Sequence, residues 1–85
     1  MWVQPREYKH VGDALAAARE TAGLTQSQLA KRLRKPQSFV SDYERGQRRI
    51  DVLELLRIAD VLQCDPRTIF ADIIVRRAAK LSKGR

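Results

Sequence analysis

The stretch Gln26–Gly46, QSQLAKRLRKPQSFVSDYERG, decides the fold of this chain. Thr25, which precedes it, can cap a helix, and Gln28 can close a capping box by reaching back to the backbone N–H of the cap. Pro36 interrupts that helix, because proline disfavours helical geometry in the residue before it. Proline also suits the first turn of a new helix. The stretch therefore predicts two short helices joined by a tight turn, the second spanning Pro36–Arg45.

The second of these helices has two unlike faces. At about 100° per residue, one side gathers the apolar side chains Phe39, Val40 and Tyr43. The other side carries short polar groups and one arginine: Gln37, Ser38, Ser41, Asp42 and Arg45. Two short helices joined by a tight turn occur in any small helical bundle, so the turn alone is not diagnostic. An ordinary surface helix, however, turns long Lys and Glu side chains outward. Short polar groups suit a helix that enters the DNA major groove, about 12 Å wide, so the pattern indicates a recognition helix.

Three further helices are predicted around this pair. Apolar residues at three- and four-residue steps predict a helix over residues 11–22, which Gly23 ends. Asp51 and Glu54 form a second capping box, and the helix after them is apolar around most of its circumference, which predicts burial on several sides. Asp65 can cap a last helix that runs to about residue 80. No segment alternates with the period of two that a half-buried strand requires, so we expect an all-α fold of five helices.

The length of the chain, 85 residues, is that of one small domain with a modest core. We assign residues 1–10 to an N-terminal arm, 11–80 to the DNA-binding domain with its C-terminal helix, and 81–85 to a tail that frays. A domain of this size has room for one binding surface, and a deep enzyme cleft is not expected.

The chain is strongly basic, with 17 Lys and Arg against 10 Asp and Glu and a formal net charge of +7. Such an excess favours polyanions, either nucleic acid or an anionic lipid surface, although solubility alone can also account for it. Between residues 31 and 49 only Asp42 and Glu44 oppose the basic side chains. These are Lys31, Arg32, Arg34, Lys35, Arg45, Arg48 and Arg49. Because they cluster around the helix pair and do not flank one broad apolar face, nucleic acid is favoured over a membrane surface.

Several chemistries find no support in the composition. Cys64 is the single cysteine and His10 the single histidine, so an intramolecular disulfide and a cysteine-rich zinc site are excluded, and Cys64 is either a buried small hydrophobe or a reactive thiol. Without paired carboxylates or a glycine-rich phosphate loop, we expect no enzyme activity, no metal and no cofactor. No apolar run reaches the roughly 18 residues of a membrane span, and residues 1–10 lack the apolar core of a signal peptide. We therefore expect a cytoplasmic protein.

The stretches Thr25–Ala30, TQSQLA, and Ser38–Gly46, SFVSDYERG, resemble the Cro/CI-type (XRE family) helix-turn-helix. The family pattern is Thr-Gln-x-x-Leu-Ala at the start of one helix, Ser-x-x-Ser in the next, and then Glu-x-Gly. Arg19 also matches an arginine that family members usually carry in their first helix. The resemblance covers about residues 11–70. It implies a five-helix, lambda-repressor-like domain and a sequence-specific transcriptional regulator that binds double-stranded DNA, as a repressor on a palindromic operator.

The resemblance also implies roles for individual residues. Base contacts are implied for Gln37, Ser38 and Asp42, and a position near base or backbone for Ser41. Phosphate contacts are implied for Gln26, Arg45, Arg48 and Arg49. Gln26 would also brace the recognition helix, although a glutamine beside a cap can be merely solvated. Arg19 and Glu44 match a family pair that is largely buried between two helices, and we interpret this pair as structural.

Two departures from the family pattern bear on the site. Family members often carry Ser or Thr where this chain has Pro36, so the usual side-chain cap is missing, and Lys35 with Pro36 can substitute by presetting the backbone and adding a phosphate contact. Asp42 places a carboxylate on the groove side, where it is repelled by phosphates unless a cytosine amino group or Arg45 compensates it. It is either a specificity determinant, a solvent-facing residue or a sign of altered function.

The last predicted helix suggests how the protein assembles. One helix-turn-helix contacts too few base pairs for useful specificity, and a two-fold dimer places two of them about one DNA turn, ~34 Å, apart. We expect a homodimer through the apolar stripe of this helix and the end of the helix before it, although the stripe can instead close the monomer core. Its residues are Ile69, Phe70, Ile73 and Ile74. An alternative function is that of an antitoxin or other interaction module that binds a partner protein through the same stripe.

Overall fold

The computed structural model describes residues 6–83, with side chains through residue 79, and contains five α-helices and no strand in that range. The helices are α1 Tyr8–Thr21, α2 Gln26–Leu33, α3 Gln37–Glu44, α4 Val52–Leu62 and α5 Pro66–Lys83. The predicted all-α class is therefore confirmed. Residues 1–5 of the predicted arm and 84–85 of the predicted tail lie outside the described residues. Within residues 6–83, no helix combines the length and apolar character needed to cross a membrane.

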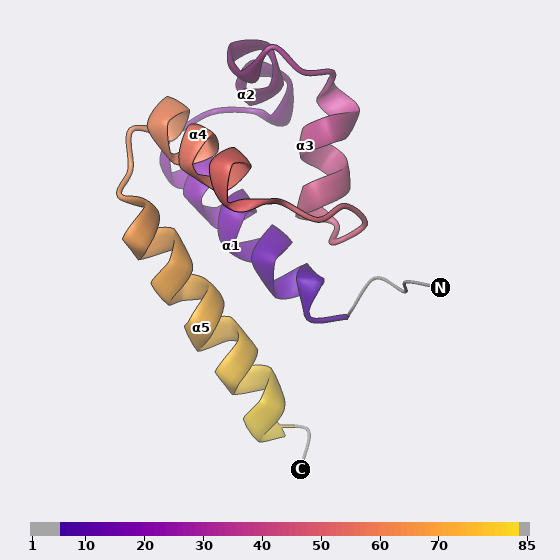
Figure 1. Cartoon of the computed structure of the whole chain (residues 1–85), viewed down its shortest axis with the longest axis vertical. Helices are drawn as coiled ribbons and strands as arrows, with labels where there is room; N and C mark the ends of the chain where they lie inside the picture. Colours follow the sequence, from indigo (N-terminus) through magenta and orange to yellow (C-terminus); the bar gives the residue numbers. More distant parts are fainter. Residues whose placement is uncertain (1–5, 84–85) are drawn as a thin grey trace.

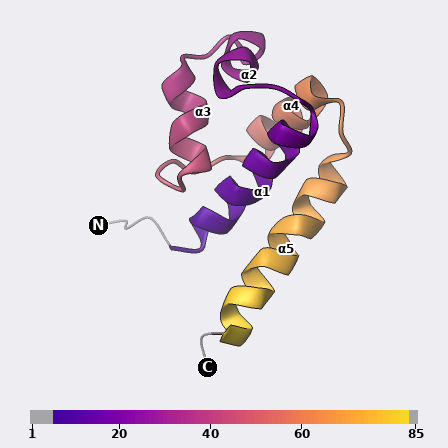
Figure 2. The same ribbon diagram turned by 180° about the vertical axis from the view of Figure 1, so that it is seen from behind.

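The helices are arranged around α1. This helix contacts α3 and α5, while α4 packs against α2 and α5 (Figure 1). α5 runs antiparallel beside α1 and extends past its start, as the views from both sides show (Figures 1 and 2). The corner formed by α2 and α3 thus occupies one end of the molecule, and the free end of α5 occupies the other.

The core takes side chains from all five helices. Its buried side chains are Leu15, Leu29, Ala30, Phe39, Val40, Tyr43, Ile58, Ala59, Leu62 and Ile69. Gly12 sets the closest approach of α1 to α3, because a Cβ at this position would lie 2.4 Å from the carbonyl oxygen of Tyr43 and 2.5 Å from that of Glu44. A side chain there would push α3 away from α1. The C-terminal end of α3 is thereby fixed by backbone packing.

The start signals expected from the sequence are present. Thr25 Oγ1 accepts a hydrogen bond from the Gln28 N–H at 3.1 Å, and Gln28 Oε1 accepts one from the Thr25 N–H at 2.9 Å. Asp51 and Glu54 form the second reciprocal pair at 2.8 and 3.0 Å. Gly23 follows α1 at φ +77°, a left-handed conformation that glycine adopts without strain. Each predicted capping box is confirmed.

Helix ends differ from the predictions at three places. α1 begins at Tyr8, so residues 8–10 of the predicted arm are helical. α5 continues to Lys83, so residues 81–83 of the predicted tail are helical too, because no glycine or proline interrupts the chain before Gly84. Pro36 is the cap of α3 in an extended conformation and not its first residue.

The prediction that the fourth helix is buried on several sides is wrong. α4 buries only Ile58, Ala59 and Leu62. Val52 and Leu53 are 73% and 63% exposed, because α4 lies on the outside of the bundle and packs along one side. Leu55 and Val61 are partly buried against the core, and Val52, Leu53 and Leu56 form part of the molecular surface.

Candidate nucleic-acid interface

The two faces predicted for α3 are confirmed. Phe39, Val40 and Tyr43 are buried, and the rings of Phe39 and Tyr43 meet edge to face with their centroids 5.4 Å apart. On the opposite side Gln37 and Ser38 are exposed, and Ser41 and Asp42 are half-buried. The apolar side therefore fixes the helix to the body of the domain, and the polar side faces out of it.

A buried ion pair joins α3 to α1. The Nε of Arg19 donates to Glu44 Oε2 at 2.7 Å and its Nη2 donates to Glu44 Oε1 at 3.1 Å, with the two side chains 13% and 5% exposed. The same guanidinium donates to the carbonyl oxygen of Leu24 at 2.8 Å, and hydrogen bonding to Glu44 raises the pKa of Arg19. Because both charges are buried, each depends on the other, and loss of one would leave an uncompensated charge.

Gln26 belongs to the same network. Its amide Nε2 donates to Glu44 Oε1 at 2.8 Å, so the first residue of α2 is tied directly to the last residue of α3. The side chain is half-buried. Its orientation is therefore set by the ion pair beneath it.

Asp42 and Arg45 pair with each other on the outer face of α3. The Nη2 of Arg45 donates to Asp42 Oδ1 at 2.7 Å, one turn along the helix, and both side chains remain substantially exposed. Ser41 Oγ donates to the carbonyl oxygen of Ser38 at 3.3 Å. The carboxylate that the sequence placed on the groove side is thus balanced within the protein by its neighbour.

Arg48 lies against α3 and α4. Its guanidinium carbon sits 4.5 Å from the centroid of the Phe39 ring, and its two terminal nitrogens donate to the Glu54 carboxylate at 3.3 and 3.1 Å. These hydrogen bonds, and one from the backbone of Asp51, lower the pKa of Glu54. The sequence suggested a phosphate contact for Arg48, but in the structure such a contact would have to share the guanidinium with Glu54 and Phe39.

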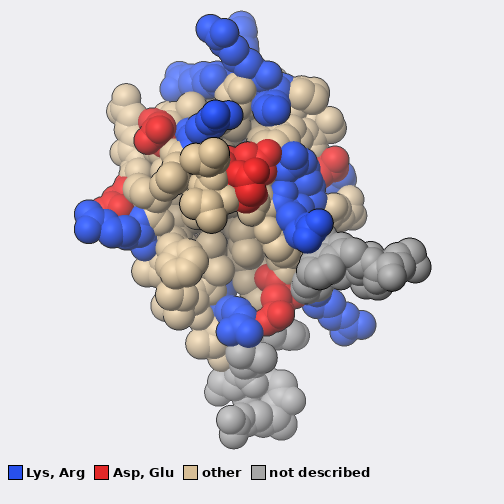
Figure 3. Space-filling model, in the orientation of Figure 1, with Lys and Arg blue, Asp and Glu red and all other residues tan. Residues whose placement is uncertain are grey.

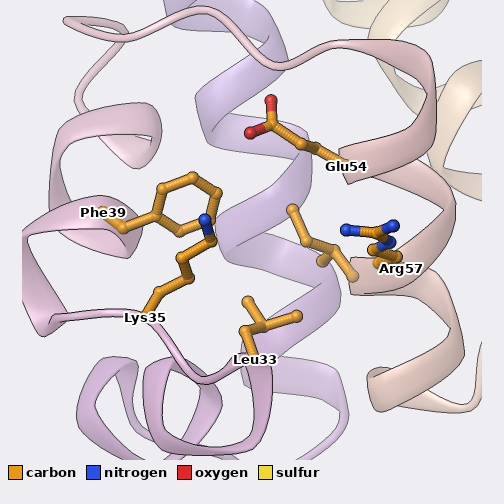
Figure 4. A pocket seen from close by; sticks show the side chains of 6 residues that line it. Leu33, Lys35, Phe39, Glu54 and Arg57 are labelled. Atoms are coloured by element: carbon orange, nitrogen blue, oxygen red, sulfur yellow. The ribbon is translucent and has the colours of Figure 1, made fainter.

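Lys35 also lies near the Phe39 ring. Its ammonium lies 5.4 Å from the ring centroid, at the edge of a cavity of about 60 Å³ between α3 and α4 (Figure 4). Arg57 and Glu54 reach toward this cavity from α4 (Figure 4). A cavity of this volume has room for only a few water molecules, so a small-molecule effector is not indicated here.

Basic side chains gather at the end of the molecule formed by α2 and α3 (Figure 3). The exposed ones in this region are Lys31, Arg32, Arg34, Lys35, Arg45 and Arg49. They lie on α2, in the turn before α3 and in the segment after α3, so a helix α3 that entered the major groove would bring positive charge close to the phosphates. Within the described residues no three His, Cys, Asp or Glu side chains meet in an arrangement that could hold a metal ion.

Sequence reasoning missed the role of Tyr8, which it placed in the arm. The Tyr8 hydroxyl accepts a hydrogen bond from the backbone N–H of Ile50 at 2.9 Å and donates one to the Ile50 carbonyl oxygen at 3.0 Å. The two residues are 42 positions apart. No local pattern could have indicated this contact, because it depends on how α1 lies against the segment after α3.

The residues predicted for a dimer interface fall into two groups. Ile69 is 3% exposed and Ile73 is half-buried, so Ile69 belongs to the monomer core and not to an interface. Phe70 and Ile74 are 57% and 54% exposed. One edge of the apolar stripe on α5 therefore packs into the monomer core, and the other edge is exposed to solvent.

This chain is similar to known helix-turn-helix proteins in sequence and in structure. A family model described as helix-turn-helix matches residues 15–69. An XRE-family like protein from Pseudomonas syringae pv. tomato is 38% identical, with 82% of this chain and 85% of that one covered and a TM-score of 0.70. The restriction-modification controller protein C.AhdI from Aeromonas hydrophila is 31% identical, with 76% and 98% covered and a TM-score of 0.70.

A third structure supports the fold alone. The clp gene regulator ClgR from Corynebacterium glutamicum superimposes with a TM-score of 0.85 over 96% of this chain and 87% of its own, at 21% identity. The search of curated proteins found no match.

Proposed function

The chain belongs to the XRE family of helix-turn-helix DNA-binding regulators, and from this premise we propose that it represses transcription by binding a palindromic operator as a homodimer. The observation that carries the proposal is the division of α3 into a buried apolar side and an outward polar side. Such a helix can lie in the major groove with its base-reading groups aimed by a rigid support.

Base reading is assigned to the outward side of α3. Gln37 can pair bidentately with adenine, and Ser38 and Ser41 can donate to or accept from several bases. Asp42 can accept from the amino group of cytosine. Its pairing with Arg45 at 2.7 Å supports this assignment, because the neighbouring guanidinium offsets the repulsion between the carboxylate and the DNA phosphates.

Phosphate contacts are assigned to residues that border this face. Gln26 is held by Glu44 through one amide N–H, and its amide carries a second N–H that a phosphate oxygen can accept. The remaining assigned contacts are Lys35, Arg45 and Arg49, with Arg48 contributing through the part of its guanidinium that Glu54 does not engage. Each neutralised phosphate adds affinity without sequence preference.

Dimerisation is assigned to an apolar patch over α4 and α5. The α4–α5 patch consists of the exposed side chains Val52, Leu53, Leu56, Phe70, Ile74 and Val75. A groove of about 320 Å³ runs through it between the two helices, with Leu56, Phe70 and Ile74 in its lining. The sequence predicted an interface that includes the end of α4, but Leu62 at that end is buried, whereas Val52 and Leu53 at its start are exposed. We therefore propose that the start of α4 takes part in its place.

A second copy of this chain suits the α4–α5 patch. Leu56, Phe70 and Ile74 share one groove, and monomeric proteins rarely expose large contiguous apolar surfaces without a partner. The side chains of the patch lie on α4 and α5, whereas those assigned to base reading lie on α3, so pairing through the patch can leave the outward side of α3 uncovered. Two copies would also supply the second half-site that specificity requires. We place such a regulator in the cytoplasm.

The proposal is tested at Gln37. On a duplex that the wild type prefers, Gln37→Ala is expected to weaken binding by roughly 1–3 kcal/mol and to relax the preference at one base position in each half-site. Titration of labelled duplexes that differ at single positions measures both effects. Gln63→Asn, at the α4–α5 turn on the side of the molecule away from α3 (Figure 1), serves as the control and should bind as the wild type does. Unchanged affinity and preference in Gln37→Ala would show that α3 does not read the bases.

A further inference from the structure

The segment between α3 and α4, residues 45–51, is held at both ends by the first turn of α1. At its start, Gly46 at φ +76° packs so closely on Lys9 that a Cβ would lie 2.8 Å from the Lys9 Cα and 2.9 Å from its backbone nitrogen. Near its end, the Tyr8 hydroxyl binds both the N–H and the carbonyl oxygen of Ile50. Two adjacent residues of α1 thus contact the same segment four residues apart.

The opposite side of the segment is fixed by Arg48. Its guanidinium lies against Phe39 of α3 and donates to Glu54 of α4, and its Nη1 also donates to the carbonyl oxygen of Arg49 at 2.7 Å. The segment is therefore gripped from α1, α3 and α4 together. The Tyr8 contact differs from the others because a single hydroxyl provides both hydrogen bonds to the backbone, so it can be removed without changing charge or volume appreciably.

The hydrogen bonds between Tyr8 and Ile50 lie beside Arg48 and Arg49, to which phosphate contacts are assigned. An open depression beside the segment is lined by Tyr8, Arg48, Arg49, Ile50, Asp51 and Glu54. Arginines 48 and 49 stand between the two points at which α1 holds the backbone. A basic segment that is already ordered loses less conformational entropy when it meets a phosphate than one that must be ordered on binding.

We propose that Tyr8 is a positioning residue for DNA binding: its hydroxyl holds the backbone of residues 45–51 in the form that meets the DNA phosphates, and it does not itself contact DNA. The inference rests on the proposed function, because it assigns a role in the same interface. It also makes the first turn of α1 part of the DNA-binding machinery through the backbone that Tyr8 holds.

Tyr8→Phe tests this role, because it keeps the ring and removes only the hydroxyl. The amide of Ile50 is expected to exchange its hydrogen at least about tenfold faster in the free variant, since its acceptor is gone. Affinity for a duplex preferred by the wild type is expected to fall about three- to tenfold. The slope of log affinity against log salt is expected to stay unchanged, because no phosphate contact is lost.

Two control variants separate positioning from other effects. Arg49→Ala should flatten the salt slope by about 0.9 if one phosphate contact is removed. Ile58→Val removes a methylene from the buried core and lowers global stability by about 0.5–1.5 kcal/mol, but should leave DNA affinity as it is in the wild type.

The outcomes are distinct. A Tyr8→Phe variant with unchanged Ile50 exchange, with wild-type affinity, or with a flattened salt slope overturns the positioning role. If Ile58→Val weakens binding as much as Tyr8→Phe does, the effect is one of general stability and the role is likewise overturned. If the wild type binds no duplex at all, the proposed function fails first, and faster exchange at Ile50 in Tyr8→Phe would then mark a purely structural contact.

Discussion

At the scale of single residues, Tyr43 is a stabilising side chain with one unsatisfied group. It is 1% exposed and packs in the core with its ring edge to face against Phe39, but its hydroxyl has no hydrogen-bond partner among the described residues. Burial, with the nearby Glu44 carboxylate, raises the pKa of Tyr43. The ring therefore contributes to stability and the hydroxyl detracts from it.

Tyr43→Phe is expected to raise the free energy of unfolding by about 1 kcal/mol at neutral pH, because it removes a buried unsatisfied hydroxyl. The advantage should grow above about pH 10. There the tyrosine ionises in the unfolded chain while the folded protein keeps it protonated, so the wild type loses up to about 1.4 kcal/mol per pH unit and the variant does not. Urea unfolding of both proteins at about pH 7 and pH 11 measures this. If the wild type and Tyr43→Phe have the same free energy of unfolding at pH 7 and again at pH 11, the Tyr43 hydroxyl does not destabilise the fold.

Residues whose roles follow from local pattern were accessible from the sequence, and residues whose roles depend on tertiary contacts were not. Thr25 and Asp51 cap helices because their partners lie three positions away. Tyr8 and Arg48 could not be placed in this way. The first binds a backbone that α1 reaches only in the folded molecule, and the second finds a carboxylate on α4 and a ring on α3.

At the scale of helices, α5 serves two surfaces at once. Ile69 closes the core while Phe70 and Ile74 face outward, and the sequence showed a single apolar stripe without indicating where its two edges would lie. The same limit explains α4, whose apolar circumference predicted burial but whose position on the outside leaves Val52 and Leu53 exposed. Periodicity gives the width of an apolar face, and only the packing of neighbouring helices determines how much of that face is covered.

Ile74→Asp tests the outward edge of α5. A carboxylate in the middle of the α4–α5 patch would have to be buried without a partner in the dimer, which is strongly unfavourable. We expect the wild type to sediment as a dimer at tens of micromolar, and Ile74→Asp to sediment as a monomer with the same helical content. Thr68→Asp adds the same charge to α5 at a position that borders the groove toward α1, and should remain dimeric. A wild type that is monomeric at this concentration would instead assign the patch to a partner protein, as the antitoxin alternative requires.

At the scale of the whole molecule, the proposed DNA-reading side chains and most of the exposed apolar side chains belong to different helices. Basic side chains gather at the end formed by α2 and α3 (Figure 3), whereas the side chains of the α4–α5 patch belong to the other two helices. The Arg19–Glu44 pair and the Gly12 contact fix α3 to α1, and α1 in turn packs along α5. The reading surface and the proposed dimer surface therefore belong to one rigid arrangement of helices, which would set the separation of two recognition helices in a dimer.

Selection of bound fragments from a random duplex pool by the wild-type protein tests this account most directly. If the outward side of α3 reads bases and two copies bind together, the selected fragments will share a two-fold symmetric sequence whose halves are centred about one DNA turn, 10–10.5 base pairs, apart. Recovery of fragments without any shared sequence, at a salt concentration where binding persists, would contradict the claim that this helix recognises a specific site.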